Sequence, residues 1–211
     1  MITEDGVQKI LLDQFNVSRE TLARLEAYRE LMVKWAKQIN LVGPATLTHF
    51  WERHVLDCAQ LLPIVGNSAR SFVDFGSGAG LPGLIIARLL ADTSKTFQVH
   101  LVEASAKRCG FLREAVRTLG VHVTIHQTKI ETLAPFKVDV VTARAFAPLY
   151  KLLGYAHPWT ELGSRVFFFK GEEVQSEIDQ ASTNWSFQSR INPSITDSRG
   201  CIIEIDDLAP L

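Results

Sequence analysis

Apolar residues in the first third of the chain recur every three or four positions, the spacing of one face of a helix. This stripe runs through Leu22, Leu25, Tyr28, Met32, Trp35 and Ile39. A second helix is predicted from Thr48, a suitable cap, to Leu62, with Pro63 as its stop. Asn40–Pro44 ends in a Gly-Pro pair and predicts the turn between them. Residues 1–66 are therefore expected to form a helical N-terminal extension.

From residue 71 onward, short apolar strands alternate with helices. The first five strands are predicted at 71–75, 99–102, 121–125, 138–142 and 166–169. Alternation of this kind indicates a parallel sheet covered by helices on both faces. After a helix at 172–181, two apolar runs at 185–191 and 201–205 surround a turn-rich segment and predict an antiparallel pair. Residues 67–211 are thus predicted to form a Rossmann-like α/β domain with a seven-stranded, mostly parallel sheet.

Composition narrows the classes of partner. The net charge is −1, so the chain as a whole does not attract nucleic acid, and an RNA partner would need a local basic patch. The three cysteines are far apart and form no CxxC pair, so we expect no metal site and no disulfide framework. The first residues lack the pattern of a signal peptide, and the apolar stretch 81–91 is too short to span a bilayer. A cytoplasmic protein without a membrane partner is the expectation.

The strongest candidate chemistry lies between the first predicted strand and the helix that follows it. Three glycines, Gly76, Gly78 and Gly80, alternate there within the segment 72–83. Glycine allows a sharp turn with positive φ and lets a ligand approach the backbone, and the next helix offers free N–H groups. Ligands of open parallel sheets bind beyond the carboxyl ends of the strands. The pattern therefore predicts a nucleoside site, although an ordinary tight turn would share it.

Two carboxylates decide between possible nucleosides. Glu103 ends the next strand, where an acid can accept hydrogen bonds from both ribose hydroxyls. The segment Gly78–Gly83 matches GxGxxG, so an NAD(P)-dependent oxidoreductase remains an alternative. However, Asp74 lies two residues before the first glycine, where it would repel a pyrophosphate but favour a cationic amino-acid ligand. S-adenosylmethionine carries an ammonium and a sulfonium and no phosphate, so it is the favoured cofactor.

The segment Asp74–Gly83, DFGSGAGLPG, resembles the first motif of the bacterial 16S rRNA guanine-N7 methyltransferase family RsmG, also called GidB. Other matches follow in order: Asn40-Leu41, Arg53-His54-x-x-Asp57, Glu103-x-x-x-Lys107-Arg108-x-x-Phe111-Leu112, Arg144-Ala145-Phe146-Ala147 and Lys170-Gly171. The resemblance implies a class I methyltransferase fold and methyl transfer to N7 of a guanine (position 527) in the 530 loop of 16S rRNA. The chain departs from the pattern at Ala143 and Lys129, where the family often has Ser and Arg.

The resemblance also assigns site residues by position. It implies cofactor contacts from Gly76, Leu81, Glu103, Ile130, Glu131 and Arg144, and the glycine-turn pattern adds Asp74, Ser77, Gly78 and Gly80. Substrate contacts are expected from Arg53, His54, Arg144 and Lys170. For Arg144 and Lys170 the alternative is a structural ion pair. For Arg53 and His54 the alternative is a capping role or a pair with Asp57, which lies four residues after Arg53 on one helix face.

Guanine N7 has a free lone pair, so its attack on a methyl group needs no deprotonation, and we assign no catalytic residue. The charge pattern suggests how RNA would approach: residues 100–144 carry a net +3, whereas residues 171–211 carry a net −6. RNA is therefore expected on the glycine-turn face. Naked 16S rRNA and the small ribosomal subunit both remain possible substrates, a monomer is expected, and a cofactor-dependent RNA-binding module without catalysis is a further alternative.

Overall fold

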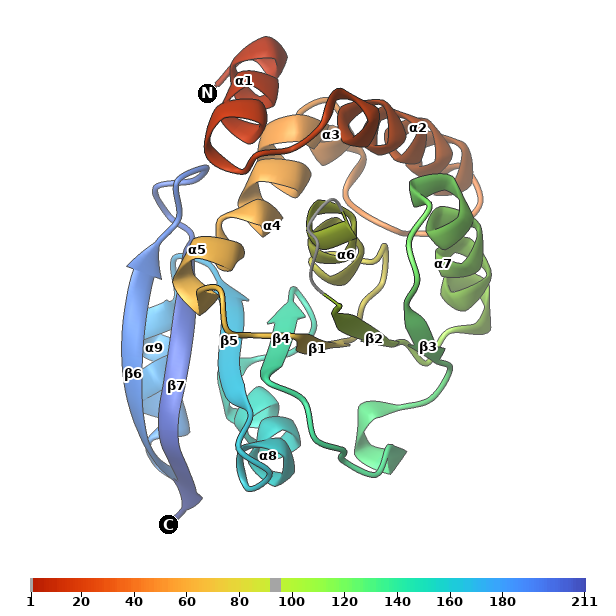
Figure 1. Ribbon diagram of the computed structural model, residues 1–211. Helices are drawn as coiled ribbons and strands as arrows, with labels where there is room; N and C mark the ends of the chain where they lie inside the picture. The colour runs from red at the N-terminus through yellow and green to blue at the C-terminus, as the bar shows by residue number, and fades with distance from the viewer. Residues whose placement is uncertain (1, 92–95) are drawn as a thin grey trace.

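The computed structural model describes residues 2–91 and 96–211 of the chain. A seven-stranded sheet forms its centre, with the order β3-β2-β1-β4-β5-β7-β6. Strands β1 to β5 are parallel to their neighbours in this group, whereas β7 is antiparallel to both β5 and β6. The strands are β1 (Ser71–Phe75), β2 (Gln98–Val102), β3 (Thr124–His126), β4 (Val140–Arg144), β5 (Arg165–Lys170), β6 (Trp185–Pro193) and β7 (Cys201–Pro210) (Figure 1). The predicted sheet is confirmed, including its antiparallel C-terminal pair.

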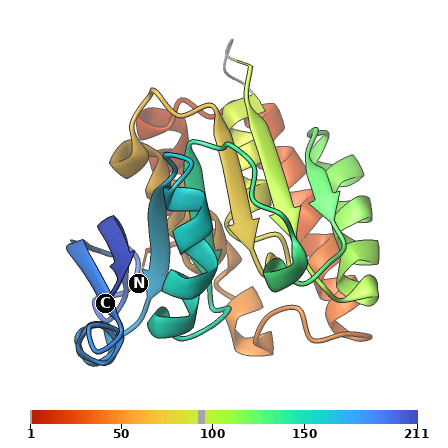
Figure 2. The ribbon, with the colours of Figure 1, turned by 90° about the horizontal axis from the view of Figure 1, so that it is seen from below.

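The strand order creates a switch point between β1 and β4. The chain moves outward from β1 through β2 to β3, and then returns to β4 on the other side of β1. Crevices outside the carboxyl ends of the strands at such a point are where open α/β sheets bind ligands. The β6–β7 pair lies at the far end of the sheet, beside β5 (Figure 2).

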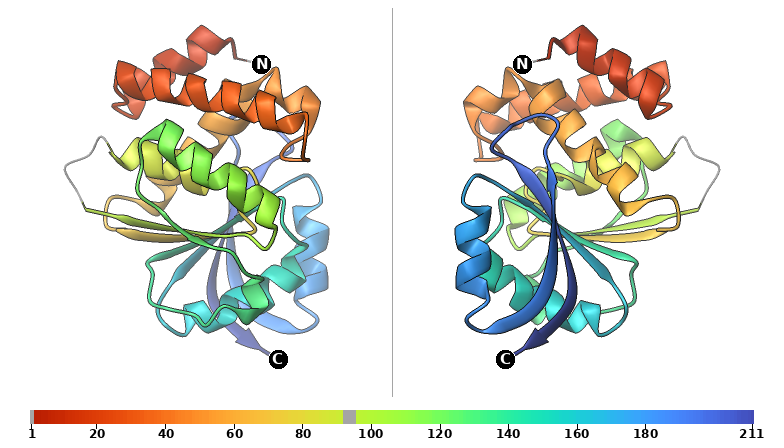
Figure 3. Two further views of the ribbon diagram at one scale, coloured as in Figure 1. Left: turned by 90° about the vertical axis from the view of Figure 1, so that its right-hand side faces the viewer. Right: turned by 90° about the vertical axis from the view of Figure 1, so that its left-hand side faces the viewer.

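Helices cover both faces because successive strand side chains point to opposite sides. In β1, Phe72 belongs to one core cluster, and Val73 and Phe75 belong to the other. One face packs against α6 (Gly83–Ala91), α7 (Ala106–Leu119) and the extension helices α1 (Glu4–Gln14) and α2 (Arg19–Ala36); the other packs against α8 (Leu149–Thr160) and α9 (Val174–Ala181) (Figures 1 and 3). The sequence pattern predicts helices in the regions of α1 and α8 but does not give their bounds. None of the helices in the described part of the chain is long and apolar enough to cross a membrane.

The segment predicted as one helix over 48–62 is instead broken. After the short α3 (Pro44–Leu47), a π-helical turn η1 (Trp51–Leu56) leads into α4 (Asp57–Ala59) and α5 (Leu61–Val65). Pro63 lies inside α5, so its prediction as a stop is wrong. It is the third residue of that helix, where a missing N–H removes no intrahelical hydrogen bond.

The extension packs directly on the α/β part of the chain. Val7, Leu25 and Tyr28 share one buried cluster with Leu84 of α6 and Phe111 of α7. Figure 3 shows α2 lying along α7. A domain boundary near residue 66 stays a prediction, but the two parts share this core.

Candidate active site

Four of the predicted site residues fall in one row across the sheet. Phe75 pairs with Val102 of β2 and Ala143 of β4, so the next residues, Gly76, Glu103 and Arg144, are neighbours on adjacent strands. Arg144 in turn pairs with Phe169 of β5, which puts Lys170 one position beyond. Because parallel strands share one carboxyl edge, the row lies at the switch point.

The glycine turn has the backbone conformation that its sequence predicted. Gly76, Gly78 and Gly80 have φ of +64°, +55° and +86°, a region that other residues enter at a cost. The Ser77 N–H donates to the Val102 carbonyl at 3.0 Å, which ties the turn to β2. The Ser77 hydroxyl donates to the Asp74 carbonyl at 3.0 Å. Ser77 therefore fixes the turn to both β1 and β2.

The side chain of Glu103 contacts this turn. Its side chain is buried, with the residue only 5% exposed. Oε2 accepts a hydrogen bond from the Gly78 N–H at 3.0 Å, and Oε1 accepts one from the Ser105 N–H at 2.8 Å. Arg108 adds a more distant charge, with Nη1 3.8 Å from Oε2. The carboxylate is thus held at the turn with acceptor capacity left over, as the ribose-binding prediction requires.

Asp74 lies beneath the turn and is almost completely buried. Burial raises its pKa to about 7, although hydrogen bonds and the positive charge of Arg144 oppose the rise. Thr142 Oγ1 donates to Oδ1 at 3.1 Å, and the Gly83 N–H donates to Oδ2 at 3.4 Å. A cation brought near this carboxyl group would favour its ionised form.

The N-terminal extension reaches the same turn through Tyr28. This side chain is fully buried, and its hydroxyl donates a hydrogen bond to the Ala79 carbonyl, between the second and third glycines. Sequence periodicity predicted Tyr28 only as part of an apolar helix stripe. A 3.6-residue pattern reports which face is buried and carries no information about a polar partner 51 residues away.

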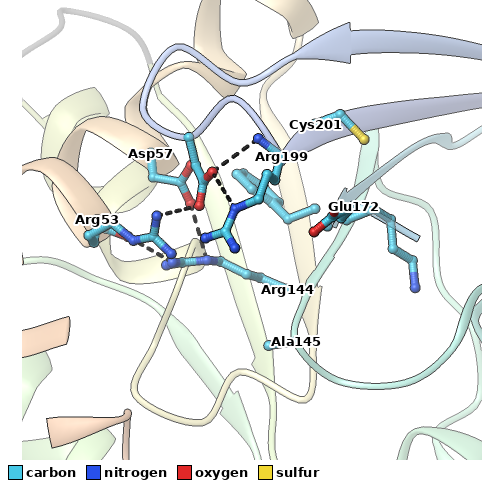
Figure 4. Close-up of a pocket in the computed structure, with 12 residues that line it drawn as sticks. Arg53, Asp57, Arg144, Ala145, Glu172, Arg199 and Cys201 are labelled. Carbon is cyan, nitrogen blue, oxygen red and sulfur yellow. Dashed lines mark hydrogen bonds and ion pairs between the residues drawn. The ribbon is translucent and has the colours of Figure 1, made fainter. Parts of the chain in front are cut away.

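Arg144 is anchored to the helical segment of Arg53 and Asp57 (Figure 4), which also carries His54. Its Nε lies 3.3 Å from Asp57 Oδ2, and its Nη2 donates to the Arg53 carbonyl at 2.7 Å. Nη1 lies 3.4 Å from His54 Nδ1. The side chain therefore forms the structural ion pair that the sequence left open, while it still lines a cleft.

His54 and Arg53 differ in their access to solvent. His54 is 3% exposed, and its pKa is lowered to about 3 by burial and by the charges of Arg144 and Arg53. The neutral ring can accept from Arg144, and a substrate contact from His54 stays a prediction. Arg53 is more open, and its Nη1 lies 2.5 Å from Asp197 Oδ2. The pair considered between Arg53 and Asp57 is thus replaced by Arg53–Asp197 and Arg144–Asp57.

Lys170 also has partners within the protein. Its Nζ donates to Glu177 Oε2 at 2.6 Å and to the Ala147 carbonyl at 3.1 Å, and its side chain is only 6% exposed. The lysine therefore joins the loop after β4 to α9. In this conformation its charge is compensated within the protein.

A polar cleft of about 390 Å³ opens beside Arg144. It is lined by Arg53, Asp57, Arg144, Ala145, Phe169, Lys170, Gly171, Glu172, Asp197, Arg199, Gly200 and Cys201 (Figure 4). Asp197 and Arg199 come from the β6–β7 loop, which the sequence pattern does not assign to the site. Nothing in that loop resembles a motif, and only the fold brings it to the helical segment.

The remaining predicted cofactor residues lie close to the turn or after β3. Leu81 is buried within the turn, and Ile130 is buried in the short 3₁₀ helix η2 (Ile130–Thr132). Glu131 is exposed, and its Oε1 accepts a hydrogen bond from the Tyr155 hydroxyl at 3.0 Å. Among the described residues, no cluster of three or more His, Cys, Asp or Glu side chains could hold a metal ion.

The strand order and the glycine-and-carboxylate edge define the class of protein: an S-adenosylmethionine-dependent methyltransferase with the Rossmann-like fold. Solved structures share this fold. An O-methyltransferase from Bacillus cereus in complex with SAH superposes with a TM-score of 0.60 at 15% identity, over 95% of this chain and 97% of that one. A SAM-dependent methyltransferase from Aquifex aeolicus gives 0.55 at 14% identity, over 82% of this chain and 96% of that one.

The sequence relatives are more specific. The model of the GidB family, rRNA small subunit methyltransferase G, matches residues 21–201. Ribosomal RNA small subunit methyltransferase G of Paramagnetospirillum magneticum is 44% identical over 199 residues, which are 94% of this chain and 95% of the relative. The protein of the same name from Parvibaculum lavamentivorans is 44% identical over 213 residues, which are 98% and 94% of the two chains. The chain belongs to the GidB family. The methyltransferase prediction is confirmed, and the oxidoreductase alternative is not supported.

Proposed function

We propose that this protein transfers a methyl group from S-adenosylmethionine to N7 of a guanine (position 527) in the 530 loop of 16S rRNA. Family membership supports an rRNA methyltransferase. The observation that carries the proposal in the structure is the Glu103 carboxylate, held by Gly78 and Ser105 at the switch point. The choice of base and atom comes from the family motifs in residues 74–83 and 144–147.

In this proposal each residue at the carboxyl edge of the sheet contacts a different part of the cofactor. Glu103 accepts hydrogen bonds from the ribose hydroxyls, and the backbone of 76–81 approaches the amino-acid part. Asp74 supplies negative charge for the ammonium group. Ile130 and Glu131 flank the adenine. The groups present fit such a ligand because buried acceptors meet a turn in which every second residue is a glycine with positive φ.

The pH dependence of cofactor affinity tests the role of Asp74. A cation near its carboxyl group would lower the pKa from about 7, so binding releases a proton. Affinity for S-adenosylmethionine is therefore expected to fall as pH drops below 7, by up to about tenfold per pH unit. Calorimetry between pH 5.5 and 8 measures it, with Asp74→Asn as the control in which this part of the dependence disappears. Equal slopes for both proteins would contradict the assignment.

The main task of the protein in methyl transfer to N7 is to position the two reactants. S-adenosylmethionine, when bound, supplies a methyl group on a positively charged sulfur. N7 attacks with its own lone pair, so the residues need to hold the base in line and keep water out, which is worth about 7–11 kcal/mol in favourable cases. The base becomes cationic, and the exposed carboxylate of Glu172 in the cleft would stabilise that charge, whereas Asp57 and Asp197 are already paired with Arg144 and Arg53. Arg144, fixed by Asp57, would then position the base or the cofactor.

Basic side chains beside the turn are the proposed RNA contacts. Lys107, in the first turn of α7, and Lys129, just before η2, are exposed and flank Glu103 and Ile130. Changing either to glutamine is expected to reduce the slope of log affinity against log salt concentration by about 1 for each phosphate that the protein no longer neutralises. Fluorescence anisotropy with a fragment of 16S rRNA measures the slope.

Arg190 provides the matched control for these lysines. It is exposed on β6, at the acidic C-terminal end of the sheet, and Arg190→Gln should leave the salt slope unchanged. A larger effect at Arg190 than at Lys107 would contradict the proposed approach of RNA to the glycine-turn face.

Methyl incorporation tests the function as a whole. The purified protein is incubated with labelled S-adenosylmethionine and either 16S rRNA or small ribosomal subunits, and the modified nucleotide is mapped by cleavage at 7-methylguanosine. We expect one modified guanine in the 530 loop, formed by a monomer acting in the cytoplasm. Comparing the two substrates separates recognition of naked RNA from recognition of the particle. Binding without methyl incorporation at this guanine would contradict the proposed reaction.

A further inference from the structure

The loop after β4 holds an aromatic ring against the glycine turn. A Cβ atom built on Gly76 would lie 2.1 Å from Cδ2 of Phe146, so the ring is in direct contact with this glycine. Phe146 is nevertheless 38% exposed. One side of the ring therefore touches the cofactor turn while part of it faces solvent.

The backbone before the ring is also unusual. Ala145 has φ +51°, a left-handed conformation that alanine rarely adopts. This residue follows Arg144 at the end of β4 and lies beside it at the cleft (Figure 4). The turn at Ala145 brings the side chain of Phe146 back over Gly76. The loop after β4 thus combines an exposed aromatic ring, Phe146, with a strained backbone at Ala145. Backbone strain of this kind is concentrated at functional sites.

The Phe146 ring lies between the proposed cofactor residues and the cleft beside Arg144. On one side the Tyr155 ring lies 6.0 Å away at 38°, and its hydroxyl donates to Glu131. On the other side Phe146 lines a second hollow, which shares Ala145 and Lys170 with the polar cleft. A base that enters from the cleft would meet the ring next to the cofactor turn.

An aromatic ring at this position could favour methyl transfer to guanine. An aromatic face stacks with any nucleobase and attracts cations more strongly than neutral groups. Guanine is neutral before methyl transfer to N7 and cationic afterwards. An aromatic contact would therefore strengthen as the reaction proceeds, and only interactions of that kind raise the rate of the chemical step.

We propose that Phe146 is the platform on which the target guanine stacks, and that its π face stabilises the positive charge that develops on the base. This inference rests on the proposed function of the site. It makes Phe146 a substrate-contacting residue, in addition to those that the family motifs assign.

The test compares side chains of similar shape and different electron density. Phe146→Leu is expected to lower kcat at saturating cofactor by about tenfold, whereas Phe146→Trp retains activity. The dissociation constant for S-adenosylmethionine should change by less than about twofold, because the ring acts on the base. Site-specific incorporation of mono-, tri- and pentafluorophenylalanine at 146 should lower kcat stepwise, which a purely steric role would not produce. Tyr150→Leu, at another exposed aromatic, is the control and should remain active.

The outcomes are distinguishable. Equal kcat across the fluorinated series, or full activity of Phe146→Leu, would overturn the inference while the wild-type activity upheld the proposed function. Tighter cofactor binding by Phe146→Leu with unchanged kcat would also overturn it, because the ring would then merely compete for cofactor space. If the wild-type protein methylated no rRNA, the proposed function and this inference would both fail. Thermal unfolding of each variant checks that it is folded.

Discussion

Replacement of Glu103 by alanine is expected to weaken S-adenosylmethionine binding by at least about 100-fold, because hydrogen bonds to a charged group contribute about 1.5–3 kcal/mol each and two are removed. The carboxylate already accepts from Gly78 and Ser105 and is buried against the turn. Calorimetry measures the affinity. Methyl incorporation should fall at low cofactor concentration and recover in part when the cofactor is raised, since the loss is mainly one of binding.

Two further variants test whether the loss of affinity comes from the Glu103 carboxylate. Glu103→Gln keeps the shape and one acceptor oxygen, so an intermediate loss of about tenfold is expected. Glu161→Gln changes an exposed acid that follows α8 and should bind the cofactor like the wild type. Wild-type affinity in Glu103→Ala would exclude the carboxylate from the cofactor site.

Replacement of Arg144 by alanine is expected to remove activity and to destabilise the fold. Asp57 would lose its guanidinium partner, and the Arg53 carbonyl would lose a donor. Breaking a buried ion pair costs about 3–5 kcal/mol, and the low end applies here because both side chains retain some exposure. For a protein of this size, about 3 kcal/mol corresponds to a drop of about 6–12 °C in Tm. Calorimetric unfolding measures the loss.

A double variant separates stability from function. Asp57→Asn combined with Arg144→Ala removes the unpaired charge, so Tm should recover in part while methyl transfer stays absent. Arg144→Lys keeps the charge without the planar fork and is expected to be folded and weakly active. A folded double variant with wild-type activity would leave Arg144 with only a structural role.

The glycine turn and Glu103 were predictable because their signal is local. Positive φ at Gly76, Gly78 and Gly80 follows from residue type, and the acid at the end of the next strand follows from strand alternation. The parallel register then places Glu103 beside Gly76 without any further information. Local rules also account for the cap of α7 by Ser105 and for its end at Gly120, which adopts the left-handed conformation.

The partners of the charged residues were not predictable in the same way. Arg53 and Asp197 are 144 residues apart, and nothing short of the assembled fold brings the β6–β7 loop to the helical segment. The same holds for Tyr28 and Ala79. The sequence suggested substrate contacts for His54 and Lys170 and left an internal partner as the alternative. The structure buries both side chains and gives each an internal partner, because tertiary packing decides whether a polar group faces solvent.

The most direct test of cofactor binding at the glycine turn is calorimetry of the purified protein with S-adenosylhomocysteine and, separately, with NADH. We expect saturable binding of the first at one site per chain and no binding of the second. Absence of binding to S-adenosylhomocysteine and S-adenosylmethionine, even with 16S rRNA present, would contradict the assignment of this edge of the sheet as the cofactor site.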